Sequence, residues 1–378
     1  EMIVEEILPY IPDNRIEDVL YFNPADTERP VSFNPLQMDE GEDIDLKVDE
    51  NLTIFRRIMG DTGPRMDEIL RQSFYALIEK EGTTLLDFEK LLSRDDPTFR
   101  NEVISKSSDP DTVHFFRDAY PHFPNDSHLP ITTRLGKLLR PKTIRSLLCR
   151  TEGSLNFREA MDRGKILLFN LSDGILGEAN SQLLGQLIVS KFQTAVMSRA
   201  NIPKGERRDF RLYIDEFQTF TGTSATSYEK ILSRARKYKL GLVLAHQQTG
   251  QIPLDLLKEI MGNVSTFICF NVSRGDATKL ARELITQTNM EISRIREEEI
   301  LRLKVGQAYC KIGNHSFYME TYLMPERKDP RKVAFIIDES RRRYGASSYL
   351  PPPTKQIAAK EHKELSEDFE EIDPRKVF

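Results

Sequence analysis

The chain has 378 residues, of which 39% are hydrophobic and 30% carry a charge, and its formal net charge is −5. These values are typical of a soluble globular protein with one large core or two domains. They exclude a whole-molecule field that would hold nucleic acid, so any contact with DNA or RNA must come from a local basic patch.

Residues 1–59 begin with the stretch EMIVEEILPYIP, which starts at Glu1 and has the pattern of the middle of a helix. The stretch DVLYF at residues 18–22 has the composition of a strand, and the Asn-Pro pairs after it favour turns and extended chain. We therefore expect residues 1–59 to be the N-terminal part of a core domain, truncated at its start.

Residues 60–150 have a different pattern, with amphipathic helices separated by charged loops. The stretch MDEILRQSFYALIEK places six apolar residues on one helix face, namely Met66, Ile69, Leu70, Phe74, Leu77 and Ile78. The sequence therefore predicts an inserted all-α domain, after which the core domain resumes at residues 151–345. Residues 346–378, which contain PPP and many charges, predict a flexible charged tail.

Four nearly continuous apolar runs in residues 151–345 predict parallel strands that are buried on both faces. The runs are GKILLFNL, FRLYIDEF, LGLVLAHQQ and STFICFNV. The segments between them have helical periodicity; in one, Thr226 and Glu229 have the spacing of a capping box, and Asp276 is a candidate N-cap of another. This alternation predicts an α/β fold with a doubly wound, mostly parallel sheet. A hairpin around Gly313 and Asn314 is expected at its edge.

Two carboxylates, Asp215 and Glu216, directly follow the strand-forming run RLYI. This is the Walker B pattern, in which the first carboxylate holds Mg²⁺ and the second polarises the water that attacks a phosphoryl group. We expect Phe217 and Phe220 to pack against the turn and keep the carboxylates in place. The alternative is a solvated loop after an ordinary strand, since Asp-Glu is a common dipeptide.

The run LVLA leads to a second polar cluster, His246, Gln247 and Gln248. Ligands of open α/β sheets bind at the carboxyl ends of the strands, where both clusters are expected to lie. A glutamine there can hydrogen-bond the γ-phosphate of ATP or the attacking water without adding charge. The alternative is that these amides only cap a neighbouring loop.

Basic residues flank the two predicted strands, and three of them are candidates for stabilising charge on a transferring phosphoryl group across a subunit boundary. These are Arg234, Arg236 and Arg274. The alternative is a solvated helix face. The phosphate-binding pattern G-x-x-x-x-G-K-[ST] does not occur in the 378 residues, so we expect this chain alone to bind ATP poorly and to be inactive.

The three cysteines, Cys149, Cys269 and Cys310, lie far apart in apolar surroundings and are expected to be reduced core residues. Three histidines, His114, His122 and His128, are a weak candidate for a metal site, because their spacing fits no usual ligand set. Aromatic packing between helices is the alternative for that segment.

The order of these segments resembles the motor domain of type IV coupling proteins, the conjugative DNA-transfer ATPases of the TraG/TraD type within the FtsK/HerA group. The similarity covers most of residues 1–323 and rests on EEILPYIPDNRIEDVLYFNPADTERPVSFNPLQ, GKILLFNLSDGILGE, RLYIDEFQTF, ILSRARKYKLGLVLAHQQTGQI and NVSTFICFNVSRGDATKLA. It implies a RecA-like motor whose phosphate-binding loop lies just before Glu1.

The resemblance also implies roles for individual residues. Asp215 would bind Mg²⁺, Glu216 would be the catalytic glutamate, and Gln247 would match the glutamine that closes an Ala-Thr-Gln-like motif, in which His246 stands for the threonine. Gln248 is a further candidate for nucleotide binding. The all-α domain would correspond to the one that the family places at the mouth of the ring.

The same resemblance implies ATP and Mg²⁺ as cofactors, a homo-hexameric ring and DNA as the substrate. Relaxosome or secretion-channel proteins are the implied partners, at the cytoplasmic face of a membrane that many members reach through N-terminal helices. Two alternatives stay open: a soluble HerA-like DNA-processing ATPase, and a non-hydrolysing scaffold that retains the fold.

Overall fold

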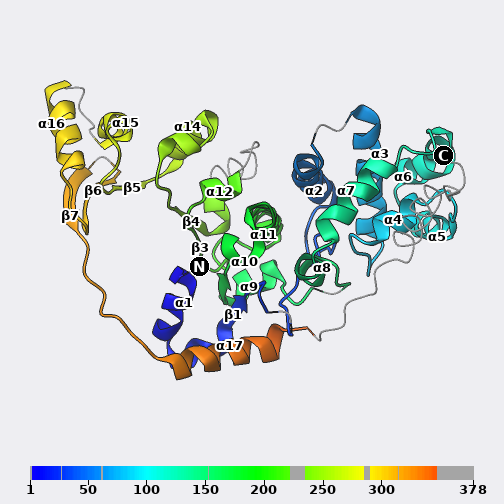
Figure 1. The fold of residues 1–378 in the computed structure, drawn as a ribbon, viewed down its shortest axis with the longest axis horizontal. Helices are drawn as coiled ribbons and strands as arrows, with labels where there is room; N and C mark the ends of the chain where they lie inside the picture. Colours follow the sequence, from blue (N-terminus) through cyan, green and yellow to red (C-terminus); the bar gives the residue numbers. More distant parts are fainter. Residues whose placement is uncertain are drawn as a thin grey trace, which may run out of the picture.

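The computed structural model describes residues 2–346, except residues 27, 61–62, 152, 222–234, 285–289 and 314. Two pairs of strands lie near the middle of the molecule, a further group of strands lies at its left-hand side, and a large group of helices lies at its right (Figure 1). Around the strands lie α1 (Met2–Ile7), α9 (Phe157–Arg163), α10 (Asp173–Leu176), α11 (Glu178–Ser198), α12 (Gln218–Thr221), α14 (Leu254–Asn263), α15 (Arg274–Leu284) and α16 (Met290–Leu301). Within the described part of the chain, no helix combines the length and apolar character that a bilayer span needs.

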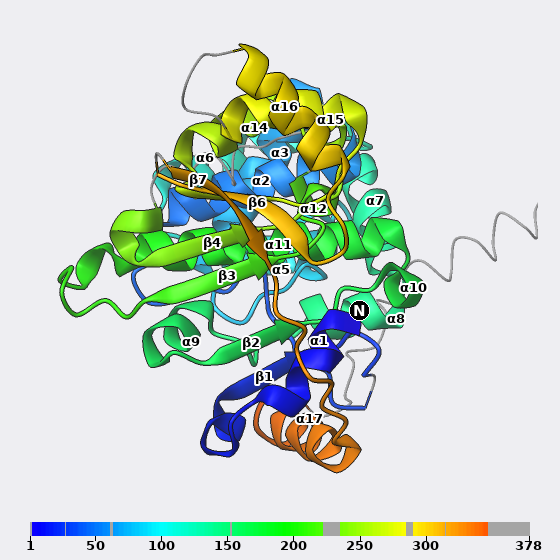
Figure 2. The same ribbon diagram turned by 90° about the vertical axis from the view of Figure 1, so that its left-hand side faces the viewer.

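Two pairs of parallel strands form the centre of the fold. Strand β1 (Val19–Phe22) pairs with β2 (Ile166–Phe169), and β3 (Phe210–Ile214) pairs with β4 (Leu240–Leu244). Figure 2 shows the two pairs one above the other, followed by the strands of a third sheet. The predicted α/β class and these four strands are therefore confirmed.

The third sheet is antiparallel and consists of β5 (Thr266–Cys269), β6 (Gln307–Ile312) and β7 (His315–Glu320). Strands β6 and β7 form the predicted hairpin, in which Gly313 has a φ of +57°, as a tight turn requires, but it pairs with β5 and does not lie at the edge of the parallel strands. The prediction that β5 joins the parallel strands is wrong. It pairs instead with β6, the first strand of that hairpin.

Strands β3 and β4 bury only one face. Phe210 and Leu242 on that face pack toward α11, where the rings of Phe210 and Phe192 lie 6.0 Å apart. On the other face, Tyr213 and Val243 face each other in register and are 67% and 45% exposed. Burial on both faces, which the continuous apolar runs predicted, is therefore wrong for this pair, because the described helices cover one face of it.

The helical region occupies one side of the molecule (Figure 1). It comprises α2 (Ile44–Met59), α3 (Pro64–Glu79), α4 (Asp87–Leu92), α5 (Thr98–Lys106), α6 (Pro110–His114), α7 (Leu129–Leu139) and α8 (Lys142–Leu148). Helix α3 matches the predicted amphipathic helix. The helices begin at Ile44, inside the segment that the sequence assigned to the core domain, and one apolar cluster runs through both regions.

A buried polar contact joins the helical region to α11. Lys47 on α2 and Lys191 on α11 both donate hydrogen bonds to the carbonyl of Gln37, the latter at 3.0 Å. Lys47 also pairs with the buried carboxylate of Glu42. Burial, together with the nearby Lys191, lowers the pKa of Lys47 to about 7. Helix α11 thus contacts the helical region on one side and β3 on another.

Helix α17 (Pro330–Tyr344) returns from the antiparallel sheet to the opposite end of the molecule and lies along β1 (Figure 1). The backbone N–H of Tyr21 in β1 donates a 2.8 Å hydrogen bond to the hydroxyl of Ser340, across 319 residues of sequence. Ile336 is fully buried in the same contact. The helix therefore covers the free edge of β1, which would otherwise present unpaired backbone groups.

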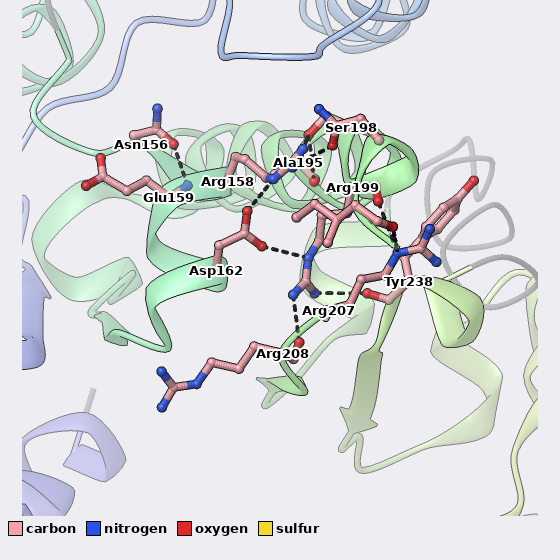
Figure 3. A network of polar contacts seen from close by, with 12 residues as sticks. Asn156, Arg158, Glu159, Asp162, Ala195, Ser198, Arg199, Arg207, Arg208 and Tyr238 are labelled. Carbon is pink, nitrogen blue, oxygen red and sulfur yellow. Dashed lines mark hydrogen bonds and ion pairs between the residues drawn. The ribbon is translucent and has the colours of Figure 1, made fainter. Parts of the chain in front are cut away.

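The amino ends of β3 and β4 are anchored by one buried guanidinium (Figure 3). Arg199, at the end of α11, is fully buried and donates to the carbonyls of Tyr238 (2.9 Å) and Arg208 (2.7 Å), which precede β4 and β3. Its Nε pairs with Asp162 of α9 at 2.9 Å. Burial lowers the pKa of Arg199, and the carboxylate of Asp162 acts in the opposite direction. This one side chain thus links two strands and two helices.

Replacing Arg199 with alanine removes a partner from two carbonyls and from the part-buried carboxylate of Asp162, which keeps its bond to Arg158. We expect the free energy of unfolding to fall by about 3–5 kcal/mol, measured by urea denaturation followed by circular dichroism. Arg163→Ala is the matched control, because its ion pair with Glu159 is largely exposed and is worth less than about 1 kcal/mol. Equal losses for the two variants would contradict the anchoring role.

All three cysteines are free and buried, as the sequence predicted. Burial raises the pKa of Cys149 to about 12 and that of Cys269 to about 11, and it also raises the pKa of Cys310. Since the thiolate is the reactive form, we expect the native protein to resist iodoacetamide at pH 8 and the urea-unfolded protein to react at all three thiols, as counted by mass spectrometry. Alkylation of a native thiol at the unfolded rate would contradict this burial.

Candidate functional site

The polar ends of β3 and β4 lie side by side because the ladder continues past both strands. The backbone N–H of Ala245 donates to the carbonyl of Ile214 at 3.0 Å, and that of Phe217 donates to the carbonyl of Ala245 at 3.1 Å. The turn that carries Asp215 and Glu216 therefore lies next to the segment that carries Gln247. The two polar clusters meet at one edge of the sheet, as the sequence predicted.

Two amides hold the carboxylate of Glu216. Nε2 of Gln247 donates to Oε1 at 2.7 Å, and Nε2 of Gln218 donates to Oε2 at 2.5 Å. Glu216 itself has a φ of +48°, in the left-handed region that non-glycine residues rarely adopt. Such a conformation costs roughly 1 kcal/mol or more and persists only where the surroundings enforce it. The position of this carboxylate is thus fixed at its backbone and at both oxygens.

Asp215 is exposed at the end of β3, and its carboxylate makes no hydrogen bond or ion pair with the residues that the structure describes. Protein sites for Mg²⁺ commonly use one or two carboxylates and complete the shell with water and substrate phosphates. An accessible carboxylate beside Glu216 fits that donor set. Asp215 is therefore the residue that would hold the ion, and Gln247 and Gln248, both exposed, lie on the neighbouring strand end.

Aromatic side chains pack against the turn that carries Glu216. Phe217 is 1% exposed, and its ring meets that of His246 edge to face with centroids 5.4 Å apart. Phe220 lies directly against Gly185 of α11, where a Cβ atom would come within 2.1 Å of the ring. Both aromatics thus pack as predicted. Burial lowers the pKa of His246, which favours the neutral imidazole at neutral pH.

Asp276 has a different role from the predicted helix cap. It lies inside the first turn of α15, and its buried carboxylate accepts hydrogen bonds from the hydroxyl and the backbone N–H of Thr249. The predicted N-cap is therefore wrong, because α15 begins two residues earlier at Arg274. The contact instead fastens the segment after Gln248 to α15.

The three candidate arginines have different positions. Arg274 is exposed at the start of α15, the helix that Asp276 joins to the segment after Gln248. Arg236 is exposed before β4, at the strand end opposite to Gln247, and the five residues of β4 separate the two by roughly 15 Å. Within one chain, Arg236 therefore does not join the site. Arg234 and the predicted capping box of Thr226 lie outside the described residues.

The candidate histidine metal site is not assembled. Nδ1 of His114 lies 2.8 Å from the carboxylate of Asp118, and both side chains are exposed. Across the described ranges, no group of three His, Cys, Asp or Glu side chains has the arrangement of a metal site. The aromatics of that segment pack together, with the rings of Phe115 and Phe116 5.0 Å apart, which agrees with the alternative interpretation.

Two contacts at the site were not predicted from the sequence. Gln218 lies two residues after Glu216 and contacts it through a turn, and the Thr249–Asp276 pair joins residues 27 apart in the chain. The sequence did contain a signal for Gln218, since an amide two residues after an acidic pair has a carboxylate within reach. No sequence pattern predicts the Thr249 contact, because it depends on how α15 packs against the segment after Gln248.

The fold as a whole is similar to that of several solved structures. The bacterial conjugative coupling protein TrwBΔN70 in complex with sulphate aligns with a TM-score of 0.52 and 14% identity, over 82% of this chain and 76% of that chain. TrwB in complex with the GTP analogue GDPNP aligns with a TM-score of 0.51 and 16% identity, over the same shares. VirB4 of Thermoanaerobacter pseudethanolicus gives a TM-score of 0.52 and 12% identity, over 81% and 77%.

No protein-family model matches the sequence, and no curated protein sequence matches it. Identities of 12–16% show similarity of fold alone. The resemblance to coupling proteins is confirmed at that level: the chain has the RecA-like α/β fold that TrwB and VirB4 share.

Proposed function

We propose that this chain is part of an ATP-driven DNA translocase motor of the coupling-protein type. The observation that carries the proposal is the Glu216 carboxylate, fixed at both oxygens beside the exposed Asp215 at the carboxyl ends of two adjacent parallel strands. This is where an α/β fold binds its ligands. TrwB, which shares the fold, has been solved with the non-hydrolysable ATP analogue ADPNP, and this supports ATP as the nucleotide.

In the proposed reaction, Glu216 accepts a proton from a water molecule as the water oxygen attacks the γ-phosphorus of ATP. The bond between that phosphorus and the bridging oxygen of ADP breaks, and the products are ADP and phosphate. Mg²⁺, when bound, would neutralise charge on the phosphate oxygens. Asp215 would hold the ion, while Gln247 and Gln248 would contact the γ-phosphate or the water.

The phosphate-binding loop of such an enzyme does not occur in the 378 residues. We therefore propose that the activity requires such a loop in addition to this chain, and we expect the chain alone to be inactive. Charge on the transferring group would be stabilised by Arg274, or by Arg234 or Arg236 of a neighbouring subunit, which is consistent with Arg236 lying exposed and away from the site of its own chain.

The proposed assembly is a homo-hexameric ring that moves DNA through its centre. Its further partners would be relaxosome or secretion-channel proteins, at the cytoplasmic face of a membrane. The similarity of fold to a conjugative coupling protein and to VirB4 supports a motor of this group.

The test of the reaction is Glu216→Gln in the full-length protein. We expect turnover of ATP to fall by a factor of roughly 10³ or more, because the proton acceptor is lost, while Mg²⁺-dependent ATP binding stays within about twofold. Phosphate release measures the first quantity and fluorescent-nucleotide titration the second. Retained hydrolysis in this variant would show that Glu216 is not the base.

Added DNA and a measurement of particle mass separate the remaining alternatives. Hydrolysis that DNA stimulates, in particles of six subunits, supports the translocase. A scaffold would show no Mg²⁺-dependent hydrolysis with or without DNA, although it would have the same fold. A HerA-like repair enzyme would hydrolyse ATP but would not restore conjugative transfer to a strain that lacks the protein.

A further inference from the structure

Gln218 is the one contact to the Glu216 carboxylate that comes from the same turn. Its Nε2 donates to Oε2 at 2.5 Å, whereas the amide on Oε1 comes from Gln247, 31 residues further along the chain. The two amides therefore restrain the carboxylate from two separate segments.

The two segments differ in how firmly they are supported. Gln218 is half-buried and begins α12, where the N–H of Thr219 donates to the carbonyl of Glu216 at 2.9 Å. The same short helix is fixed to α11 by the contact between Phe220 and Gly185. Gln247, in contrast, is exposed after the end of β4. The Gln218 contact is thus part of the packed turn, and the Gln247 contact lies at its open side.

Gln247 is the amide that is proposed to contact nucleotide or water. A glutamine amide has two N–H donors and one oxygen, so Gln247 can use its second N–H or its oxygen for a new partner and keep its bond to Oε1. A carboxylate oxygen can accept more than one hydrogen bond, so Oε1 can also accept one from water. Among the described residues, the bond from Gln218 holds Oε2 on the packed side of the turn, and Oε1 lies on the side of Gln247.

We propose that Gln218 is a positioning residue for the proposed hydrolysis, which holds Oε2 of Glu216 so that Oε1 is presented to the attacking water. The inference rests on the proposed function and assigns to it a residue outside the Asp-Glu pair. Gln218 acts through Glu216 and makes no contact with the reacting atoms. Its loss should therefore lower the rate of the chemical step without weakening ATP binding.

The test variant is Gln218→Met in the full-length protein, because methionine has nearly the same length and shape but cannot donate a hydrogen bond. We expect kcat for ATP to fall about tenfold and KM to stay within about twofold. The reason is that the variant loses a hydrogen bond to the charged Glu216, and this bond matters in the chemical step. The second arm is the double variant with Glu216→Gln, in which the residual turnover is measured with radiolabelled ATP. There, Gln218→Met should have no further effect.

Gln182→Met is the matched control, because Gln182 makes the same kind of bond, from Nε2 to Oε1 of Glu178 at 3.0 Å, on the surface of α11. We expect its kcat to equal that of the wild type. Thermal unfolding is compared for all variants. If Gln218→Met does not fold, Gln218→Asn tests the same contact, because its amide is one methylene too short to reach Oε2.

Three outcomes would overturn the proposal. The first is an unchanged kcat in a folded Gln218 variant. The second is an equal fall in kcat in the wild-type and Glu216→Gln backgrounds, which would show a general structural effect. The third is a rise in KM with kcat unchanged. Full hydrolysis by Glu216→Gln alone is a separate result, which would contradict the proposed function and not only this role of Gln218.

Discussion

The arrangement of β3 and β4 depends on one buried cation, the guanidinium of Arg199. A planar group with five N–H donors can satisfy several acceptors in fixed directions, which a lysine cannot do. Here the acceptors are the carbonyl before each strand and the carboxylate of Asp162. Both strands therefore begin at positions set by the end of α11. Because they are of equal length and parallel, they also end level with each other, which brings Glu216 and Gln247 together.

Helix α11 extends this constraint to the rest of the molecule. Arg199 directly follows its last residue, Ser190 near its middle donates a hydrogen bond to Glu50 of α2, and Gly185 in its first half meets the ring of Phe220. The helical region and the turn that carries Glu216 thus both pack against α11. Helix α11 therefore connects the turn at Glu216 to the helical region.

Local sequence patterns were sufficient for much of this fold. Apolar runs located β1 to β4, the Gly313 turn located the hairpin, and an acidic pair after a strand located the candidate site, because each depends on residues close in sequence. The pairing of β5, the exposed face of Tyr213 and Val243, and the Asp276–Thr249 contact were not predictable in this way. They depend on which segments meet in space, and an apolar run has the same pattern whether one or two of its faces are covered.

The contact between Ser340 and Tyr21 has a consequence for the order in which the protein is made. The edge of β1 is closed by a helix that is synthesised 319 residues later. At 5–20 residues per second, that edge stays open for roughly 15–60 seconds on the ribosome. During this interval an apolar strand with free backbone groups can pair with other nascent chains.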